Sequence, residues 1–279
     1  MARNAGRTRR AARPGGLILP GTLPRALAGA LPRALPGALL GALLGLGPQA
    51  SGPAGAVVGG RPAPEAAGSA VMVLSSNGGV CTGIVVAPDA VLTAGHCVAA
   101  RAEHRVHYKD AAGAPVLAEI AARALHPGYD SGAVAGRRRS IDLALVRLAA
   151  PLPGRFVPAP LRAALPRAGD RLTLSGYGVA AAGDARSTGT YRSVDLGVIE
   201  PYGPSRILVW LGAGPGGASA CQGDSGGPIG AGPAVLAVSA WAAGKACGGV
   251  SQGVLLGPQR DWIDRTLSGW GSAARWSGA

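Results

Sequence analysis

The run Gly223-Asp224-Ser225-Gly226-Gly227 is the part of this 279-residue chain whose residue types point most directly to chemistry. A sharp glycine turn can present a serine hydroxyl as a nucleophile beside free backbone N–H groups, and such groups stabilise an oxyanion. Glycine accounts for 47 of the 279 residues, so the run alone would also fit an ordinary turn. The role of Ser225 therefore depends on whether the chain also supplies a base.

Two other segments supply a base and a group that orients it. His96 lies in the run Thr-Ala-Gly-His-Cys, and Asp142 stands beside the apolar run 143–146, which we expect to form a strand containing Asp142. A serine hydroxyl is a weak nucleophile until an imidazole accepts its proton, and a carboxylate on the other ring nitrogen fixes the imidazole tautomer. Because a carboxylate buried in an apolar strand is costly without a partner, we expect Asp142 to pair with His96.

The order of histidine, aspartate and serine, with these flanking residues, resembles the chymotrypsin/trypsin family of serine endopeptidases. The resemblance covers about residues 57–267, and it includes a Val-Val-Gly-Gly start at Val57 and the run His-Pro-Gly-Tyr-Asp from His126. Further matches are the run Leu-Ser-Gly-Tyr-Gly from Leu174 and a Trp-Ile pair at Trp262 near the end. We expect a secreted member of the bacterial type.

This resemblance implies an all-β fold of two antiparallel six-stranded β-barrels with a short C-terminal helix. The short Val/Leu/Ala-rich runs that alternate with Gly, Pro and Asp clusters after residue 57 independently indicate an all-β barrel or sandwich. The implied domains are a leader over 1–56, a first barrel over 57–160 that carries the histidine and aspartate, and a second barrel over 161–279. The second barrel would hold the serine, the specificity pocket and the C-terminal helix.

The resemblance also assigns roles to individual residues. His96, Asp142 and Ser225 would be catalytic, and the N–H groups of Gly223 and Ser225 would form the oxyanion hole. The ammonium group of Val57, once freed, would pair with Asp224 and order the oxyanion turn. The implied disulfides are Cys81–Cys97 and Cys221–Cys247.

No metal or other cofactor is expected, because the four cysteines form no Cys-x-x-Cys motif and no Cys/His cluster. His104 and His107 resemble a metal-binding pair only superficially, since residues three apart on a strand face opposite sides. We expect both to be surface histidines. Calcium bound by scattered acidic residues stays open, although the sequence contains no ordered ligand loop.

The predicted substrate pocket is formed by Ser219, Trp241, Ala242 and Gly253. Trypsin-like members carry an aspartate at the position of Ser219. The absence of this aspartate argues against a basic side chain at P1, the residue that precedes the scissile bond. Gly253 is expected to keep one wall open, and Ala242 replaces a more usual glycine, which should narrow the pocket. We expect small to medium apolar P1 residues, with aromatic ones second.

Two departures from the family pattern bear on this pocket. Ala240 stands where a serine usually contacts the catalytic aspartate, although Ser239 could serve after a slip of one residue. The stretch before Cys247 is longer than usual, so Lys245 either approaches the pocket, where it would favour an acidic P1 residue, or is solvated. The arginine run 137–139 either favours acidic residues upstream of the cleaved bond or is also solvated.

Residues 1–56 are predicted to be a targeting segment. The front is basic, residues 39–47 are apolar, and Ala54-Gly55-Ala56 fits a small-x-small cleavage site. Cleavage there would free Val57 directly, whereas an earlier cut would leave a pro-segment, and the unusually long front leaves the true start site open. The apolar stretch is too short to span a bilayer stably, so we expect a secreted protein with no stable membrane insertion after the leader is removed.

Composition narrows the partners. The net charge of +13 includes seven arginines of the leader, which leaves 20 − 14 = +6 for the part after residue 56. This is basic without the stripe of Lys/Arg and aromatic residues that marks nucleic-acid binding. We expect protein or peptide substrates, no nucleic acid and a monomer. The alternative is a catalytically silent, protease-like binding protein, and an esterase is disfavoured because the order of an α/β-hydrolase triad is not found.

Overall fold

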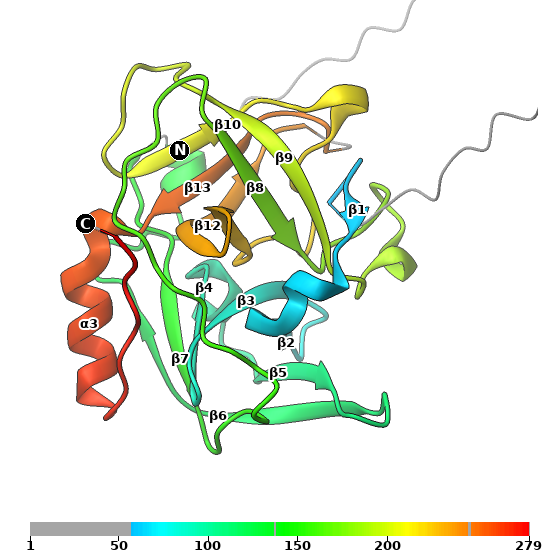
Figure 1. Ribbon diagram of the computed structural model, residues 1–279, viewed down its shortest axis with the longest axis vertical. Helices are drawn as coiled ribbons and strands as arrows, with labels where there is room; N and C mark the ends of the chain where they lie inside the picture. Colours follow the sequence, from blue (N-terminus) through cyan, green and yellow to red (C-terminus); the bar gives the residue numbers. More distant parts are fainter. Residues whose placement is uncertain (1–56, 137, 245–246, 279) are drawn as a thin grey trace, which may run out of the picture. The chain divides into compact units, whose positions relative to one another are not determined.

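In the computed structural model, residues 57–136, 138–244 and 247–278 are described. These residues form two β-barrels that lie side by side, with a helix along one flank (Figure 1). The leader over 1–56 lies outside the described residues, and so do Arg137 and Lys245.

The first barrel is a closed antiparallel ring in the order β2-β3-β4-β7-β6-β5. Its runs are rich in Val, Leu and Ile, which suit the pleated surface of a strand. The strands are β2 (Ala70–Ser75), β3 (Val80–Ala87), β4 (Ala90–Thr93), β5 (His104–Lys109), β6 (Pro115–Leu125) and β7 (Ala144–Leu148). Two one-turn helices connect them, α1 (His96–Ala99) between β4 and β5 and α2 (Ala133–Gly136) between β6 and β7.

The second barrel runs in the order β9-β10-β13-β12-β11-β8 and closes because β8 also pairs with β9. Its strands are β8 (Arg171–Gly176), β9 (Arg192–Ile199), β10 (Leu208–Leu211), β11 (Pro228–Ala231), β12 (Ala234–Ala242) and β13 (Ser251–Leu255). Short 3-10 helices cover 64–69, 185–187, 215–217 and 257–259, and the helix α3 (Arg260–Gly269) follows the last of them. The all-β fold of two six-stranded barrels with a short C-terminal helix is thereby confirmed.

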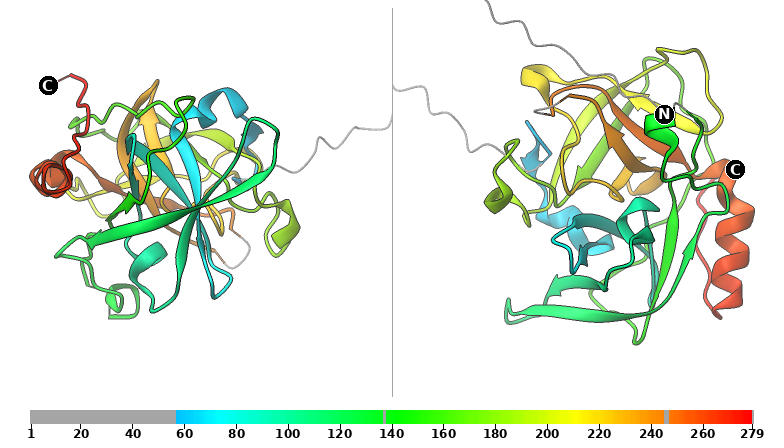
Figure 2. Two further views of the ribbon diagram at one scale, coloured as in Figure 1. Left: turned by 90° about the horizontal axis from the view of Figure 1, so that it is seen from below. Right: turned by 180° about the vertical axis from the view of Figure 1, so that it is seen from behind.

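Each barrel also receives a terminal segment of the other. The short strand β1 (Arg61–Pro62) precedes the first barrel but pairs with β9 of the second. The helix α3 follows the second barrel but lies against the first, where Trp262 stacks on His126 with ring centroids 4.8 Å apart (Figures 1 and 2). These exchanged segments hold the two barrels together at both ends of the described chain.

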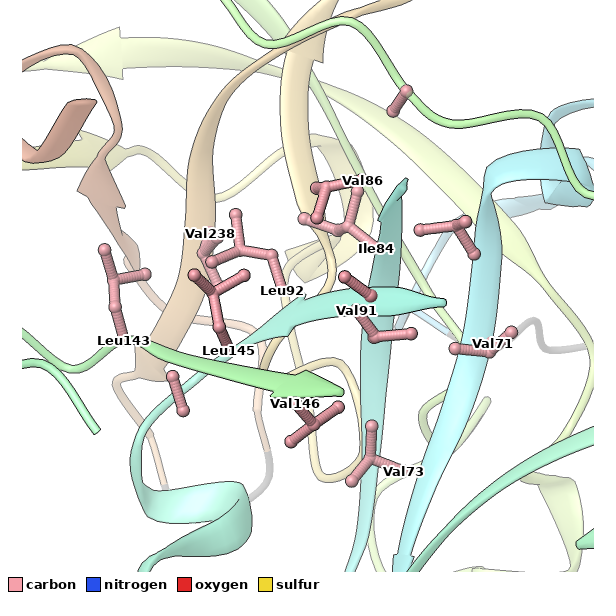
Figure 3. Close-up of a cluster of buried hydrophobic side chains, with 14 of the residues drawn as sticks. Val71, Val73, Ile84, Val86, Val91, Leu92, Leu143, Leu145, Val146 and Val238 are labelled. Carbon is pink, nitrogen blue, oxygen red and sulfur yellow. The ribbon is translucent and has the colours of Figure 1, made fainter. Parts of the chain in front are cut away.

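The larger hydrophobic core reaches from the first barrel into the second. Side chains of β2, β3, β4 and β7 point into one cluster, which Val238 of β12 joins (Figure 3). Each fully buried aliphatic side chain of this kind contributes about 1.5–3 kcal/mol. A second cluster around Leu174, Leu196 and Ile229 fills the second barrel and includes Val57. Side chains of the first barrel and of β12 therefore share one apolar interface between the two barrels.

Candidate active site

The residue His96 and the carboxylate of Asp142 are joined by two hydrogen bonds, one from the backbone and one from the imidazole. The backbone N–H of His96 donates to Oδ1 at 2.8 Å, and Nδ1 lies 2.7 Å from Oδ2. With Nδ1 carrying the hydrogen, Nε2 is left as the basic nitrogen. Asp142 precedes β7 by two residues instead of lying within a strand, and its side chain is 18% exposed. The pairing expected from the sequence is therefore present, in a loop held between strands.

Gly95 makes the close approach of these two residues possible. A Cβ atom at this position would lie 2.9 Å from the ring of Tyr129, 3.0 Å from Oδ1 of Asp142 and 3.2 Å from the carbonyl of Leu143. Any larger residue would push the aspartate away from His96. The glycine before the histidine is thus required by packing against a segment that begins 47 residues later in the chain.

Ser225 lies in a turn whose backbone is held on one side and free on the other. Gly223 adopts a positive φ of 96°, and the N–H of Gly226 donates to the carbonyl of Ser239 at 2.7 Å. Within the described part of the chain, the N–H groups of Gly223 and Ser225 donate to no protein acceptor. Two adjacent free N–H groups of this kind can receive a developing oxyanion.

His96, Gly223 and Ser225 line one cavity of about 310 Å³. No hydrogen bond joins the hydroxyl of Ser225 to the imidazole of His96 in the described residues, and such bonds are often long before a substrate binds. The disulfide sulfur of Cys97 lies 3.7 Å from His96 Nε2 and 3.8 Å from the carbonyl oxygen of Ser225. The cavity therefore brings His96 of the first barrel and Ser225 of the second into one space.

Two buried threonines of the first barrel hold the serine turn of the second. The N–H of Thr82 donates to the carbonyl of Ser225 at 2.8 Å, and its hydroxyl donates to the carbonyl of Gly223 at 2.8 Å. The hydroxyl of Thr93 donates to the carbonyl of Thr82 at 2.8 Å. Gly226 packs so closely against both threonines that a side chain there would overlap them.

Asp224 is completely buried beneath the turn. Its carboxylate accepts the N–H of Gly178 and the N–H of Cys221, each at 2.9 Å. Burial raises the pKa of this carboxyl to about 7, although the two hydrogen bonds oppose the rise. A group in this state favours either a proton or a nearby cation.

Val57 is also fully buried, in the core of the second barrel. The carbonyl of the following residue, Val58, accepts the N–H of Ser219 at 3.0 Å. The start of the described chain is therefore bonded to Ser219, which precedes Ser225 by six residues. The segment that begins at Val57 therefore reaches the neighbourhood of the serine turn.

The four predicted pocket residues lie on β12, on β13 and beside the serine turn. Ser219 is fully buried, and its hydroxyl accepts the N–H of Gly248 at 2.7 Å and donates to the carbonyl of Ala220. Trp241 is 38% exposed, and Ala242 packs partly against the core of the second barrel. A side chain at Gly253 would overlap Ile229, so this glycine also has a packing reason inside the barrel.

The strand β12 shifts its register between Ser239 and Trp241. At this irregularity Ala240 has no directly opposite partner on β13. Ala240 is buried, and Ser239 is fully buried beside the serine turn. Ser239 contacts the serine turn through its backbone, since its carbonyl accepts the N–H of Gly226 and its N–H donates to the carbonyl of Gly227. No hydrogen bond from Ser239 to Asp142 is found in the described residues.

Both cysteine pairs are disulfide-bonded as the resemblance implied, Cys81 with Cys97 and Cys221 with Cys247. Within the described ranges, one group of three potential metal ligands lies close together, formed by Cys81, His96 and Cys97. Because both of its cysteines are oxidised, this group offers no thiolate for a metal ion.

The expectation that His104 lies on the surface is wrong. His104 is 7% exposed and lines the cavity, while His107 on the other face of β5 is half-buried. Burial and the charge of Arg123 lower the pKa of His104, which favours the neutral form of its imidazole. In the arginine run, Arg138 pairs with Asp130 at 2.7 Å and is not a free cation.

Several functional positions were not recognised in the sequence. Thr82, Thr93, Gly95 and Gly226 all act through contacts with distant segments. The one available signal was their position next to predicted site residues, since Thr82 follows Cys81 and Gly95 precedes His96.

Comparison with known proteins agrees with this geometry. Two β-barrels with a serine turn, a paired histidine and aspartate, and two disulfides define a serine-type endopeptidase. A family model described as Trypsin matches residues 57–263, and the chain belongs to this family. The sequence is 27% identical to Serine protease 1 of Rattus norvegicus over 205 residues, which cover 68% of this chain and 80% of that one. It is 29% identical to Trypsin zeta of Drosophila melanogaster over 219 residues, covering 68% and 74%.

Solved structures show the same fold. Neuropsin, a serine protease of mouse brain, superposes with a TM-score of 0.64 at 22% identity and covers 75% of this chain and 98% of its own. A mutant of human heparin binding protein gives a TM-score of 0.65 at 23% identity, covering 76% and 97%. The relatives found are animal proteins, so they lend no support to a bacterial type. Proteins of this family act on protein substrates, and none of the helices in the described ranges has the length and hydropathy needed to span a membrane.

Proposed function

We propose that this chain hydrolyses peptide bonds with a Ser-His-Asp triad through an acyl-enzyme. The observation that carries the proposal is that His96, which forms two hydrogen bonds with Asp142, lines one cavity with Ser225. Ser225 attacks the scissile carbonyl, and Nε2 of His96 accepts its proton and then gives it to the leaving amine. A water molecule repeats the sequence and releases the acid product.

The oxyanion that forms in each step binds to the N–H groups of Gly223 and Ser225. Both groups are without a protein acceptor in the described residues, and they flank the buried Asp224. Each such donor contributes about 3 kcal/mol to the transition state.

The acyl side of the substrate lies toward β12, where Trp241 and Ala242 stand, and the leaving side enters the cavity of about 310 Å³. Residues of β2, β3 and β5 line this cavity, whereas none of the four predicted pocket residues does. Ser219 is uncharged and its hydroxyl is already hydrogen-bonded, so it provides no countercharge for an arginine or lysine. Small to medium apolar P1 residues are therefore the preferred substrates, with aromatic ones second.

Activation proceeds by release of the ammonium group of Val57, which then compensates the charge of Asp224. Val57 and Asp224 are both fully buried, and Asp224 has no cationic partner in the described part of the chain. Cleavage after Ala56 during export would free this group directly. The mature enzyme is a secreted monomer.

The test is fluorophosphonate labelling of purified secreted protein, with Ser225→Ala as control and amino-terminal sequencing of the same sample. We expect labelling of wild-type chains that begin at Val57, no labelling of the variant, and hydrolysis of apolar P1 substrates ahead of Arg or Lys substrates. A chain that begins at Val57 and does not react would instead support the catalytically silent binding protein. Inactive secreted protein that begins upstream of Val57 would contradict direct activation.

A further inference from the structure

Thr82 of the first barrel forms hydrogen bonds with the serine turn of the second barrel. It is fully buried on β3, and its backbone N–H donates to the carbonyl of Ser225 at 2.8 Å. Its hydroxyl donates to the carbonyl of Gly223 at 2.8 Å and accepts the N–H of Tyr177 at 2.9 Å. The hydroxyl therefore donates one hydrogen bond and accepts one, and both partners belong to the second barrel.

The two carbonyls that Thr82 holds flank Asp224 in the turn. When the carbonyls of Gly223 and Ser225 are drawn toward the first barrel, rotation of the backbone about these positions is restricted. The N–H groups of the same two residues then stay on the free side of the turn, where both residues line the cavity. Gly223 has a φ of 96°, a region open to glycine. Without an anchor, the peptide group that carries its N–H could therefore rotate at little steric cost.

The carboxylate of Asp224 also anchors the turn. Its hydrogen-bond donors, the N–H groups of Gly178 and Cys221, both belong to the second barrel. Thr82 anchors the turn from the first barrel, through the carbonyls of Gly223 and Ser225. The two anchors are independent, since they share no hydrogen-bond partner.

We propose that the hydroxyl of Thr82 is a positioning group for the oxyanion hole, which locks the Gly223 carbonyl so that the N–H groups of Gly223 and Ser225 face the reacting carbonyl. This inference rests on the proposed function. Thr82 touches neither the substrate nor the reacting atoms, and it acts through the turn. It also makes the oxyanion hole depend on correct docking of the two barrels.

The experiment compares Thr82→Val, which replaces the hydroxyl with a methyl group of similar size, with Thr82→Ser, which keeps the hydroxyl. The matched control is Ser193→Ala, because Ser193 takes part in a buried hydrogen bond of 2.7 Å with Ser175 and its hydroxyl forms no hydrogen bond with the turn in the described residues. For each variant, active sites are titrated with a fluorophosphonate, and kcat and KM for one peptide amide are measured per titrated site. The affinity of a peptide aldehyde, which forms an oxyanion on binding, is measured in parallel.

We expect Thr82→Val to lower kcat per titrated site by about tenfold to a hundredfold, the range for a misplaced oxyanion donor. KM should stay near the wild-type value, and the affinity for the aldehyde should fall in parallel with kcat. Thr82→Ser should restore both quantities, and Ser193→Ala should keep the wild-type kcat per site. If Thr82→Val does not fold, Thr82→Ala serves as the hydroxyl-free variant.

A wild-type kcat per site in the hydroxyl-free variant would overturn the proposal. An equal loss in Ser193→Ala would also overturn it, because the effect would then be a general loss of packing. Failure of the proposed function is a separate result, since the wild-type protein itself would then not react at Ser225.

Discussion

The stability of this enzyme should depend on pH between 5 and 8 before its amino terminus is freed and much less afterwards, because Asp224 is buried without a cation in the described residues. The pKa of its carboxyl rises from the ordinary value of 3.8 to about 7. A carboxyl group with a higher pKa in the folded state binds more protons when folded, so the free energy of unfolding falls as the pH rises between these two values. The difference corresponds to about 4 kcal/mol once Asp224 is fully ionised.

The penalty should be present in a chain that still carries residues upstream of Val57 and offset in a chain that begins there. In the mature form the ammonium group supplies the missing countercharge, and the carboxylate is then favoured over the neutral acid. Between about pH 5 and pH 8, the extended form should therefore lose about 2.5–3 kcal/mol of stability that the mature form keeps. The comparison uses the Ser225→Ala background, in which neither form can digest itself.

The assay is urea unfolding of both forms at pH 5, 6, 7 and 8, followed by tryptophan fluorescence. An Asp224→Asn variant of the extended form serves as control, because the amide cannot ionise and should remove the slope. Equal slopes in the two forms, or a slope in the extended form that survives Asp224→Asn, would refute the assignment of this carboxyl as the activation switch.

Three further predictions concern the site and the links between the barrels. Asp142→Asn should lower kcat by about 10⁴-fold, the size of this change in the Ser-His-Asp template, because the catalytic histidine loses its tautomer; steady-state kinetics with a peptide amide measure it, and activity near wild type would argue against the triad. Gly226→Ala should lower the free energy of unfolding by about 3 kcal/mol or more, because its side chain would overlap Thr82 and the residue has a φ of 84°; urea unfolding measures it. Replacing Cys81 and Cys97 together by serine should cost about 3 kcal/mol for a loop of 16 residues, and a loss below about 1 kcal/mol would contradict the loop-entropy account.

Much of the fold and of the candidate site was predictable from local residue patterns. The runs around His96, Asp142 and Ser225 stand in one order with recognisable flanks, so they indicated the family, the two barrels and both disulfides. Alternating apolar runs could indicate strands because the side chains of a strand alternate between two faces. The P1 preference, the roles of the site residues and the release of Val57 remain predictions.

The tertiary structure decided which residues support the site. Thr82 meets the carbonyl of Gly223 across 141 residues, and Gly95 is required by a segment 47 residues away. Such contacts leave no periodic trace in the sequence, because closure of the barrels and not local propensity brings the partners together. The burial of His104 and the register shift of β12 at Ala240 also result from the packing of the barrels. Sequence alone thus determined the chemistry of the nucleophile, base and orienter, whereas the packing of two barrels determined how that chemistry is held in place.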